Sequence, residues 1–502
     1  MALIVAAPET RVFRQHSPDH PEWAFDLQTA VNRARPGDVI QLLPGRYTGS
    51  TFLTMSGTAD KPITLRGSSV GRSILDGGRT RDHGRHSGLE PLDGDFAVLK
   101  LVGAKHLVLE GLFFEHPWPT AVYMRASRNI TIRHCHAAGG RFFVYARELP
   151  FAKTHDIVLD SVSWVQDPDH DMWDGRVTWT EVKAQRGAFD ASYFNGALFG
   201  SFDISGGVTI CRCNIAHAFN AIRMDCRDTR VRSGADGLTV SRNHNVAIYD
   251  NTFAFIRDNA IEPETAAADW RVFNNRFYNV HAAFSLDGVV SRDMFYLSNT
   301  ILNDRKPGLL GQENQGGKIF KFLGSKNDAE DPRRRENLVS AFNSVQSRTC
   351  YAKKGVTQHW LDAWNAVGLY PADYPDITTP PREVFNKMGW QDGITILGMV
   401  CNDPEFPNKY VKEGAQIDTA TAVGNVFEDT DYDASASDWL GGWTGALTKS
   451  SETQSVITPE LTLTRANGPD IVFPPGLTPG AQDLDALGLT DILKHSPEGA
   501  GV

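Results

Sequence analysis

The chain has 502 residues, of which 41% are hydrophobic and 22% are charged, and its formal net charge is −10. These proportions are those of a globular protein. The acidic charge argues against nucleic acid as a partner, because phosphate binding needs a basic surface. No run of about 18 apolar residues occurs, so the sequence predicts neither a transmembrane helix nor a membrane partner.

The first predicted element is a helix over residues 25–34, where apolar residues recur at helical spacing. The sequence RPGD at 35–38 ends this helix, and VIQLL at 39–43 predicts a strand that is followed by a turn at 44–47. A helix placed before the first strand of a stack would protect its open edge. We therefore expect an N-terminal capping helix.

A repeat of short strand-like blocks follows, and it determines the predicted fold. Eight blocks can be aligned, at 107–114, 130–137, 157–164, 208–215, 246–253, 270–277, 294–301 and 338–345. Their sixth residues form a column of Leu112, Cys135, Val162, Cys213, Asn251, Asn275, Asn299 and Asn343. Three of the steps in this column are 23, 24 and 24 residues, the length of one coil of a solenoid. The repeat predicts an all-β fold, a right-handed parallel β-helix, with coils about 4.8 Å apart.

The column also predicts how the stack is held together. The four Asn side chains in register can hydrogen-bond along the stack. Cys135 and Cys213 lie two coils apart, about 9.6 Å, which is too far for a disulfide. We expect the cysteines to be buried free thiols.

The opening of the repeat resembles a known group of enzymes. The segment LQTAVNRARPGDVIQLLPGRYTG, followed by KPITLRG, is similar to the start of pectate-lyase-like β-helix enzymes, including the chondroitinase B and alginate lyase group. The resemblance covers residues 25–345 and implies the β-helix fold and a carbohydrate polymer as substrate. It does not extend to the catalytic Lys and Arg motifs of that group.

The remaining sequence sets the expected domain boundaries. Residues 1–24 are an N-terminal extension, and residues 25–430 are the β-helix with insertions near 165–190, 226–243 and 350–390. Residues 431–502 are predicted to be an irregular tail packed on the helix. Residues 360–364 are predicted to be helical. The partners that we expect are a polysaccharide or oligosaccharide and, as a further hypothesis, other copies of the chain in a homo-oligomer.

A second strand recurs about ten residues after the Asn column, and it supplies the candidate site. The sequences NAIRMD at 220–225, NAIEPE at 259–264 and AAFSLD at 282–287 align. Because side chains alternate between the two faces of a strand, we expect one face to point inward and the other outward. The outward face would carry Arg223, Asp225, Glu262, Glu264 and Asp287, with His217, Arg257 and Asp258 beside it.

The first insertion adds His170, Asp171 and Trp173 as candidate substrate contacts, because loops on a rigid stack commonly carry function. Its DPDHD string is also similar to a motif of β-helix uronan epimerases. Alternatively, Arg223 pairs with Glu262 and the other charges are solvated.

Two chemistries fit the outward charges. In a polysaccharide lyase, Asp225, Glu262 and Glu264 would hold Ca²⁺ against a uronate carboxylate while Arg223 or His217 removes the C5 proton. This assignment resembles pectate-lyase chemistry. In a glycoside hydrolase, two carboxylates act as a pair, and spacings of about 5 Å or 6.5–9.5 Å correspond to the retaining and inverting mechanisms. A non-catalytic carbohydrate-binding β-helix is the third hypothesis.

Overall fold

The computed structural model consists of two compact units. Unit 1 contains Met1–Met172 and Val177–Met224, and unit 2 contains Trp173–Arg176 and Asp225–Val502. The structure describes residues 2–8, 24–80, 96–149, 151–183, 191–226, 232–234, 237–239, 242–286, 290–303, 316–321, 335–347, 352–358, 360–369, 385–392, 394–397, 400–401, 420–423, 425–428, 443–444, 447–450, 460–465, 468–478 and 480–494.

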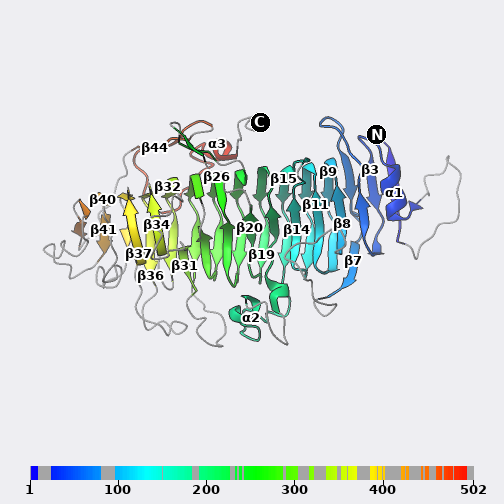
Figure 1. Cartoon of the computed structure of the whole chain (residues 1–502), viewed down its shortest axis with the longest axis horizontal. Helices are drawn as coiled ribbons and strands as arrows, with labels where there is room; N and C mark the ends of the chain where they lie inside the picture. The colour runs from blue at the N-terminus through cyan, green and yellow to red at the C-terminus, as the bar shows by residue number, and fades with distance from the viewer. Residues whose placement is uncertain are drawn as a thin grey trace. The chain divides into compact units, whose positions relative to one another are not determined.

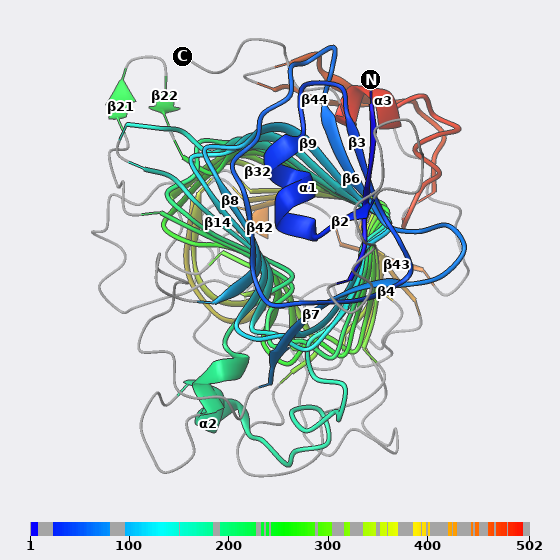
Figure 2. The same ribbon diagram turned by 90° about the vertical axis from the view of Figure 1, so that its right-hand side faces the viewer.

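Unit 1 consists of three parallel sheets that the chain visits in turn, once per coil (Figures 1 and 2). Sheet A contains β2 (Ala24–Phe25), β1 (Leu3–Ala6), β3 (Val39–Leu42), β6 (Ile63–Arg66), β9 (Lys105–Glu110), β12 (Arg128–Arg133), β15 (His155–Asp160) and β18 (Gly206–Cys211). Sheet B contains β4 (Gly45–Thr48), β7 (Ser73–Arg79), β10 (Phe113–Pro117), β13 (His136–Ala138), β16 (Ser163–Val165) and β19 (Asn214–Ala216). Sheet C contains β5 (Thr51–Leu53), β8 (Ala97–Val102), β11 (Thr120–Arg125), β14 (Phe142–Arg147), β17 (Phe199–Phe202) and β20 (Ile222–Asp225). In Figure 2, β9, β7 and β8 lie on three sides of the stack.

The predicted N-terminal helix is confirmed as α1 (Leu27–Arg33). Asp26 caps it, because its side chain accepts a hydrogen bond of 2.9 Å from the Thr29 N–H and so satisfies one of the free donors of the first turn. Its apolar face buries Leu27, Ala30 and Val31. Figure 2 shows α1 over the end of the first coil.

Unit 2 has three parallel sheets that are visited in the same order. Sheet A contains β23 (His244–Tyr249), β26 (Ala266–Phe273), β29 (Val290–Leu297), β32 (Arg335–Ala341), β35 (Trp360–Ala363), β38 (Ile394–Leu397), β40 (Ala420–Val423) and β42 (Trp443–Thr444). Sheet B contains β24 (Thr252–Ala254), β27 (Arg276–Tyr278), β30 (Thr300–Leu302), β33 (Ser344–Ser347), β36 (Ala366–Leu369), β39 (Val400–Cys401), β41 (Asn425–Glu428) and β43 (Leu447–Ser450). Sheet C contains β25 (Asn259–Pro263), β28 (Ala282–Ser285), β31 (Lys318–Lys321), β34 (Ala352–Gln358) and β37 (Phe385–Asp392). The predicted fold, a parallel β-helix, is confirmed.

The Asn column is a continuous hydrogen-bonded ladder in unit 2. The side-chain Nδ2 of Asn251 donates to the Oδ1 of Asn275, and the same contact links Asn275 to Asn299 and Asn299 to Asn343, at 2.9–3.0 Å. A fifth member, Asn365, accepts from Asn343 at 2.9 Å. The members of the column are at most 2% exposed, so each bond is shielded from water. The predicted ladder is confirmed and is one coil longer than expected.

The prediction of a helix at 360–364 is wrong. These residues form β35, which pairs in parallel with β32 in the register Leu338↔Trp360. Five residues are too few to show a helical period, and the apolar Trp and Leu of this segment are equally compatible with a core strand. Because the strand was missed, Asn365 was missed with it.

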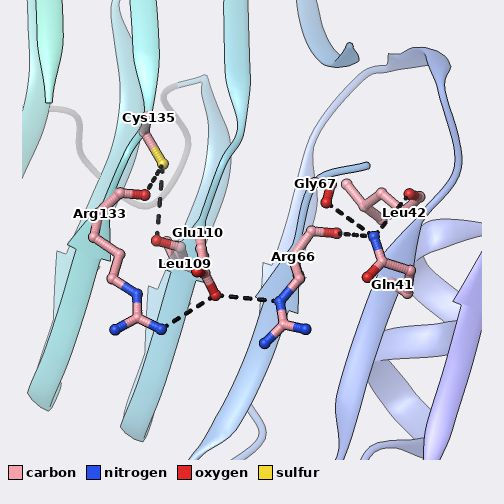
Figure 3. A network of polar contacts seen from close by, with 8 residues as sticks. All are labelled: Gln41, Leu42, Arg66, Gly67, Leu109, Glu110, Arg133 and Cys135. Carbon is pink, nitrogen blue, oxygen red and sulfur yellow. Dashed lines mark hydrogen bonds and ion pairs between the residues drawn. The ribbon is translucent and has the colours of Figure 1, made fainter. Parts of the chain in front are cut away.

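Cys135, Cys211, Cys213 and Cys226 are buried free thiols, as predicted. Burial raises the pKa of Cys135 to about 12, so its thiol stays protonated. Figure 3 shows the Sγ of Cys135 beside the backbone carbonyl of Arg133, 3.3 Å away. The same figure shows Glu110 between Arg66 and Arg133 on three adjacent strands of sheet A.

The helices of unit 1 beyond α1 lie in the first long insertion, as α2 (Trp179–Lys183) and the 3-10 helix η3 (Ala191–Phe194). Unit 2 also contains an antiparallel pair of β44 (Leu461–Leu463) and β45 (Ile471–Phe473), and the helix α3 (Thr490–Lys494). In the described part of the chain, none of the helices combines the length and hydropathy that a membrane crossing needs.

Candidate functional site

The predicted alternation on the sheet C strands is confirmed. β25 pairs with β28 in the register Ile261↔Phe284, and both side chains are fully buried in the core. Glu262 lies on the opposite face of β25, as expected, but it is only 5% exposed. An outward position on the strand therefore does not expose Glu262 to solvent.

The predicted residues divide between the two units. In unit 1, Arg223 is half-buried, and its Nη1 donates to the Oδ1 of Asn195 at 3.2 Å. In unit 2, Asp225 accepts from the backbone N–H of Cys226 at 2.7 Å and from the Thr265 hydroxyl at 3.1 Å. Asp287 lies outside the described residues.

The structure brings two predicted histidines of unit 1 together. The rings of His170 and His217 are stacked, with centroids 3.6 Å apart and planes 4° apart. The loop that carries His170 is fixed by Asp167, whose buried carboxylate accepts from the backbone N–H of Met172 at 2.8 Å. Asp171 in the same loop is 9% exposed. In unit 2, Trp173 makes an edge contact with Phe255, at 5.2 Å between centroids.

Unit 2 contains several buried ionisable groups on and next to the sheet C strands. Arg257, Asp258 and Lys318 are at most 3% exposed. The Nδ2 of Asn259 donates to the Oε1 of Glu262 at 2.5 Å, and the Nζ of Lys318 lies 3.0 Å from the Nε2 of His281. Burying a charge is costly unless it is paired, and such clusters concentrate at functional sites.

A row of polar side chains crosses the outer face of sheet C in unit 2. Ser285 is opposite Lys321 in the β28–β31 register. Because Ile261 is opposite Phe284, the next residue, Glu262, lies in the row of Ser285. The row therefore contains the carboxylate of Glu262, the hydroxyl of Ser285 and the ammonium group of Lys321. These residues are on three adjacent strands, whose backbones are about 4.8 Å apart. We call Glu262, Ser285 and Lys321 the sheet C row.

His281, Lys318 and Lys321 were missed by the sequence reasoning. Lys318 and Lys321 lie in a step of 44 residues in the repeat, from Asn299 to Asn343, in which the extra strand was not aligned, and His281 directly precedes the aligned segment 282–287. The available signal was the sequence KIFK at 318–321, whose two adjacent apolar residues are compatible with a short core strand.

Two of the three predicted calcium ligands make other contacts in the structure. Among the residues that the structure describes, no three His, Cys, Asp or Glu side chains gather closely enough to bind a metal ion. Asp225 and Glu262 are instead engaged with Thr265 and Asn259. The role of Asp225, Glu262 and Glu264 as calcium ligands stays a prediction.

No protein-family model matches the chain, and no curated protein matches its sequence. Among solved structures, a mannuronic acid-specific family 6 polysaccharide lyase from human gut microbiota is 13% identical, with a TM-score of 0.48, over 90% of this chain and 89% of that chain. A family 6 polysaccharide lyase from Pseudopedobacter saltans is 12% identical, with a TM-score of 0.42, over 88% and 91% of the two chains. A family 28 exopolygalacturonase from Yersinia enterocolitica is 10% identical, with a TM-score of 0.45, over 84% and 74%.

Proposed function

We propose that the protein is a carbohydrate-active enzyme, a polysaccharide lyase that cleaves a uronate-containing polymer by β-elimination. The observation that carries this proposal is the sheet C row, which places a carboxylate and an ammonium group on one face of a β-sheet, about two strand spacings apart. The burial of three further ionisable side chains in the same coils, Arg257, Asp258 and Lys318, supports a site rather than a solvated surface.

The row can perform the elimination with its own groups. The ammonium group of Lys321 pairs with the uronate carboxylate, which makes the adjacent C5 proton more acidic. The Glu262 carboxylate takes this proton as general base. The electrons of the C5–H bond form the C4–C5 double bond, the C4–O bond breaks, and Glu262 returns the proton to the leaving oxygen.

The test supplies a panel of uronate polymers and follows the ultraviolet absorbance of the unsaturated product, with and without EDTA. We expect Glu262→Gln and Lys321→Met to lower kcat by about 100-fold or more, the size of a lost general base or charge partner. Lys105→Met, at a half-buried lysine of unit 1, is the matched control and should leave the rate unchanged. Absence of unsaturated product across the panel contradicts the proposal.

A glycoside hydrolase is the second candidate, and one observation favours it. Glu264 follows Glu262 by two residues at the end of β25, which separates them by about 6.7 Å, close to the spacing of inverting enzymes. Glu262 is buried and Glu264 is half-buried, so the two carboxylates have different environments. New reducing ends without ultraviolet absorbance would identify this activity.

A further inference from the structure

A pocket in unit 1 is separate from the groups used above. Its volume is about 500 Å³, within the range of sites for small ligands. It lies where the sheet B strands β7, β10 and β13 end, and its charged lining residues are Arg79, Glu115, His116, Asp167 and Asp169.

One wall is a fixed network of charges on β4, β7 and β10. Glu115 lies directly opposite Asp76 on the adjacent strand, so the two carboxylates are close. Arg46 joins them, with its Nη1 2.5 Å from Asp76 and its Nη2 2.7 Å from Glu115. This pairing holds the Glu115 side chain in place at the pocket wall.

The same network orients the side chain of His116. β10 contains a register shift between Glu115 and Pro117, and His116 has a φ of 45° there. Its Nδ1 lies 2.9 Å from the Oδ1 of Asp76, which also accepts from the Gly78 N–H at 2.8 Å. Burial works to raise the pKa of Asp76, but its hydrogen bonds to Gly78, His116 and Arg46 outweigh burial and hold that pKa below its usual value.

An ionised Asp76 fixes the proton of neutral His116 on Nδ1, which leaves Nε2 as a hydrogen-bond acceptor. The His116 side chain is 51% exposed and lines the pocket. Its ring can therefore contact a ligand directly.

The floor of the pocket is built from residues with little or no side chain. Ala138, Gly139 and Gly140 follow one another there, in the coil after Glu115. Gly140 has a φ of +85°, and a Cβ on it would lie 3.2 Å from the ring of Pro117. A larger residue would be strained at this position, so the hollow depends on the glycine.

Another part of the pocket lining, Gln166 and Asp167, is also held by hydrogen bonds. The Nε2 of Gln166 donates to the carbonyls of Arg141 and Phe194, at 3.0 Å each. The next residue, Asp167, anchors its loop through the backbone of Met172 at 2.8 Å. A pocket held on both sides in this way needs little rearrangement to bind a ligand.

The charges of the lining determine which ligand fits. One arginine faces three carboxylates, from Glu115, Asp167 and Asp169, so the pocket is acidic and repels an anion. The hydroxyls of an uncharged sugar can donate to carboxylates and to the His116 Nε2, and they can accept from Arg79. We propose that this pocket binds one uncharged sugar residue. This site does not depend on the proposed lyase reaction.

The experiment titrates the full chain with glucose, galactose, mannose, xylose and their disaccharides, and with glucuronate and galacturonate, by calorimetry and saturation-transfer NMR. We expect at least one uncharged sugar to bind at millimolar concentration, and its uronate counterpart to bind about tenfold more weakly or worse, because the carboxylate meets like charge. Equal or tighter binding of the uronates, or no binding of any uncharged sugar, overturns the proposal.

Two variants locate the binding. Ala138→Trp fills the pocket from an exposed position, and Glu115→Gln removes one acceptor charge, so each should weaken binding about tenfold or more. Asn214→Trp adds the same bulk at an exposed position of sheet B that does not line the pocket, and it should bind like the wild type. Binding that survives Ala138→Trp would place the sugar elsewhere and refute the assignment.

Discussion

At the scale of single residues, the ladder in unit 2 shows how one side chain can serve two coils. The Oδ1 of Asn299 accepts from both the backbone N–H and the Nδ2 of Asn275, at 3.1 and 3.0 Å. The Nδ2 of Asn299 donates to the Val272 carbonyl at 3.0 Å and to Asn343. Each Asn therefore satisfies buried backbone groups at a turn, where the sheets leave them without partners.

Asn299→Ala should destabilise unit 2 by about 2–4 kcal/mol, because it leaves two buried backbone groups, the Asn275 N–H and the Val272 carbonyl, without these partners. Thermal unfolding and hydrogen exchange measure the loss. Asn214→Ala, at an exposed position, is the control and should change stability by less than about 0.5 kcal/mol. If both variants unfold alike, the ladder does not stabilise the fold.

The Asn column could be predicted because the regular spacing of its Asn residues can be recognised in the sequence alone. The burial of Glu262 could not be predicted in the same way. The alternation of side chains along a strand indicates on which face of the sheet a residue lies, but not whether other residues cover that face. Lys321 was missed for a different reason. Its partner in the row, Ser285, becomes its neighbour only through the register of β28 with β31, which a step of unknown insertion length hides.

At the scale of elements, sheet A of unit 1 carries a chain of alternating charges across five strands. Glu110 on β9 contacts Arg66 on β6 at 3.2 Å and Arg133 on β12 at 3.3 Å (Figure 3). Asp160 on β15 then contacts Arg212, which follows β18, at 2.6 Å. Opposite charges in adjacent parallel strands favour this register over a shifted one, in which these pairs would be lost.

The pKa of Glu110 gives this chain of charges a testable pH dependence. Burial works to raise that pKa, but the hydrogen bonds and charges of Arg133 and Arg66 outweigh it and hold the pKa below the usual 4.5. A carboxyl with a lowered folded-state pKa stabilises the fold above the unfolded value and loses this contribution as pH falls through the folded value.

We therefore expect Glu110→Gln to be less stable than the wild type by about 0.5–1 kcal/mol at pH 7, since the side chain is partly exposed. The difference should close as the pH falls below 4.5. Thermal unfolding across this range measures it, with Glu460→Gln at an exposed position as the control. A difference that stays constant with pH would contradict the assigned ion pairs.

At the scale of the whole chain, the C-terminal residues return to coils formed more than a hundred residues earlier. In unit 2, the ring of Phe473 packs 4.4 Å from that of Phe342, and the N–H of Ala481 donates to the Ser344 hydroxyl at 2.8 Å. Arg465 contacts a still earlier coil, with its Nη2 3.2 Å from the Oδ1 of Asp269. Sequence periodicity could not predict these contacts, because the returning segment contains no repeat.

The contact between the C-terminal segment and the earlier coil depends on the charge of Asp269. It lies between Arg465 and Arg271, and all three side chains are at most 7% exposed. Burial lowers the pKa of Arg271 to about 10, with Asp269 opposing the shift and Arg465 adding to it. The two guanidinium groups would repel each other without the carboxylate between them.

Replacing Asp269 by Asn should therefore cost more than replacing either arginine. Asp269→Asn leaves two buried cations without their counterion, and we expect a loss of about 3–5 kcal/mol. Arg465→Met removes one cation and leaves Asp269 with Arg271, so it should cost less and should mainly release the C-terminal segment. Hydrogen exchange separates the two, because Arg465→Met should raise exchange in β44 and β45 first, while Asp269→Asn should also raise it in β26. If Arg465→Met destabilises the protein more than Asp269→Asn does, then the packing of the arginine side chain, and not charge, holds the C-terminal segment on the earlier coils.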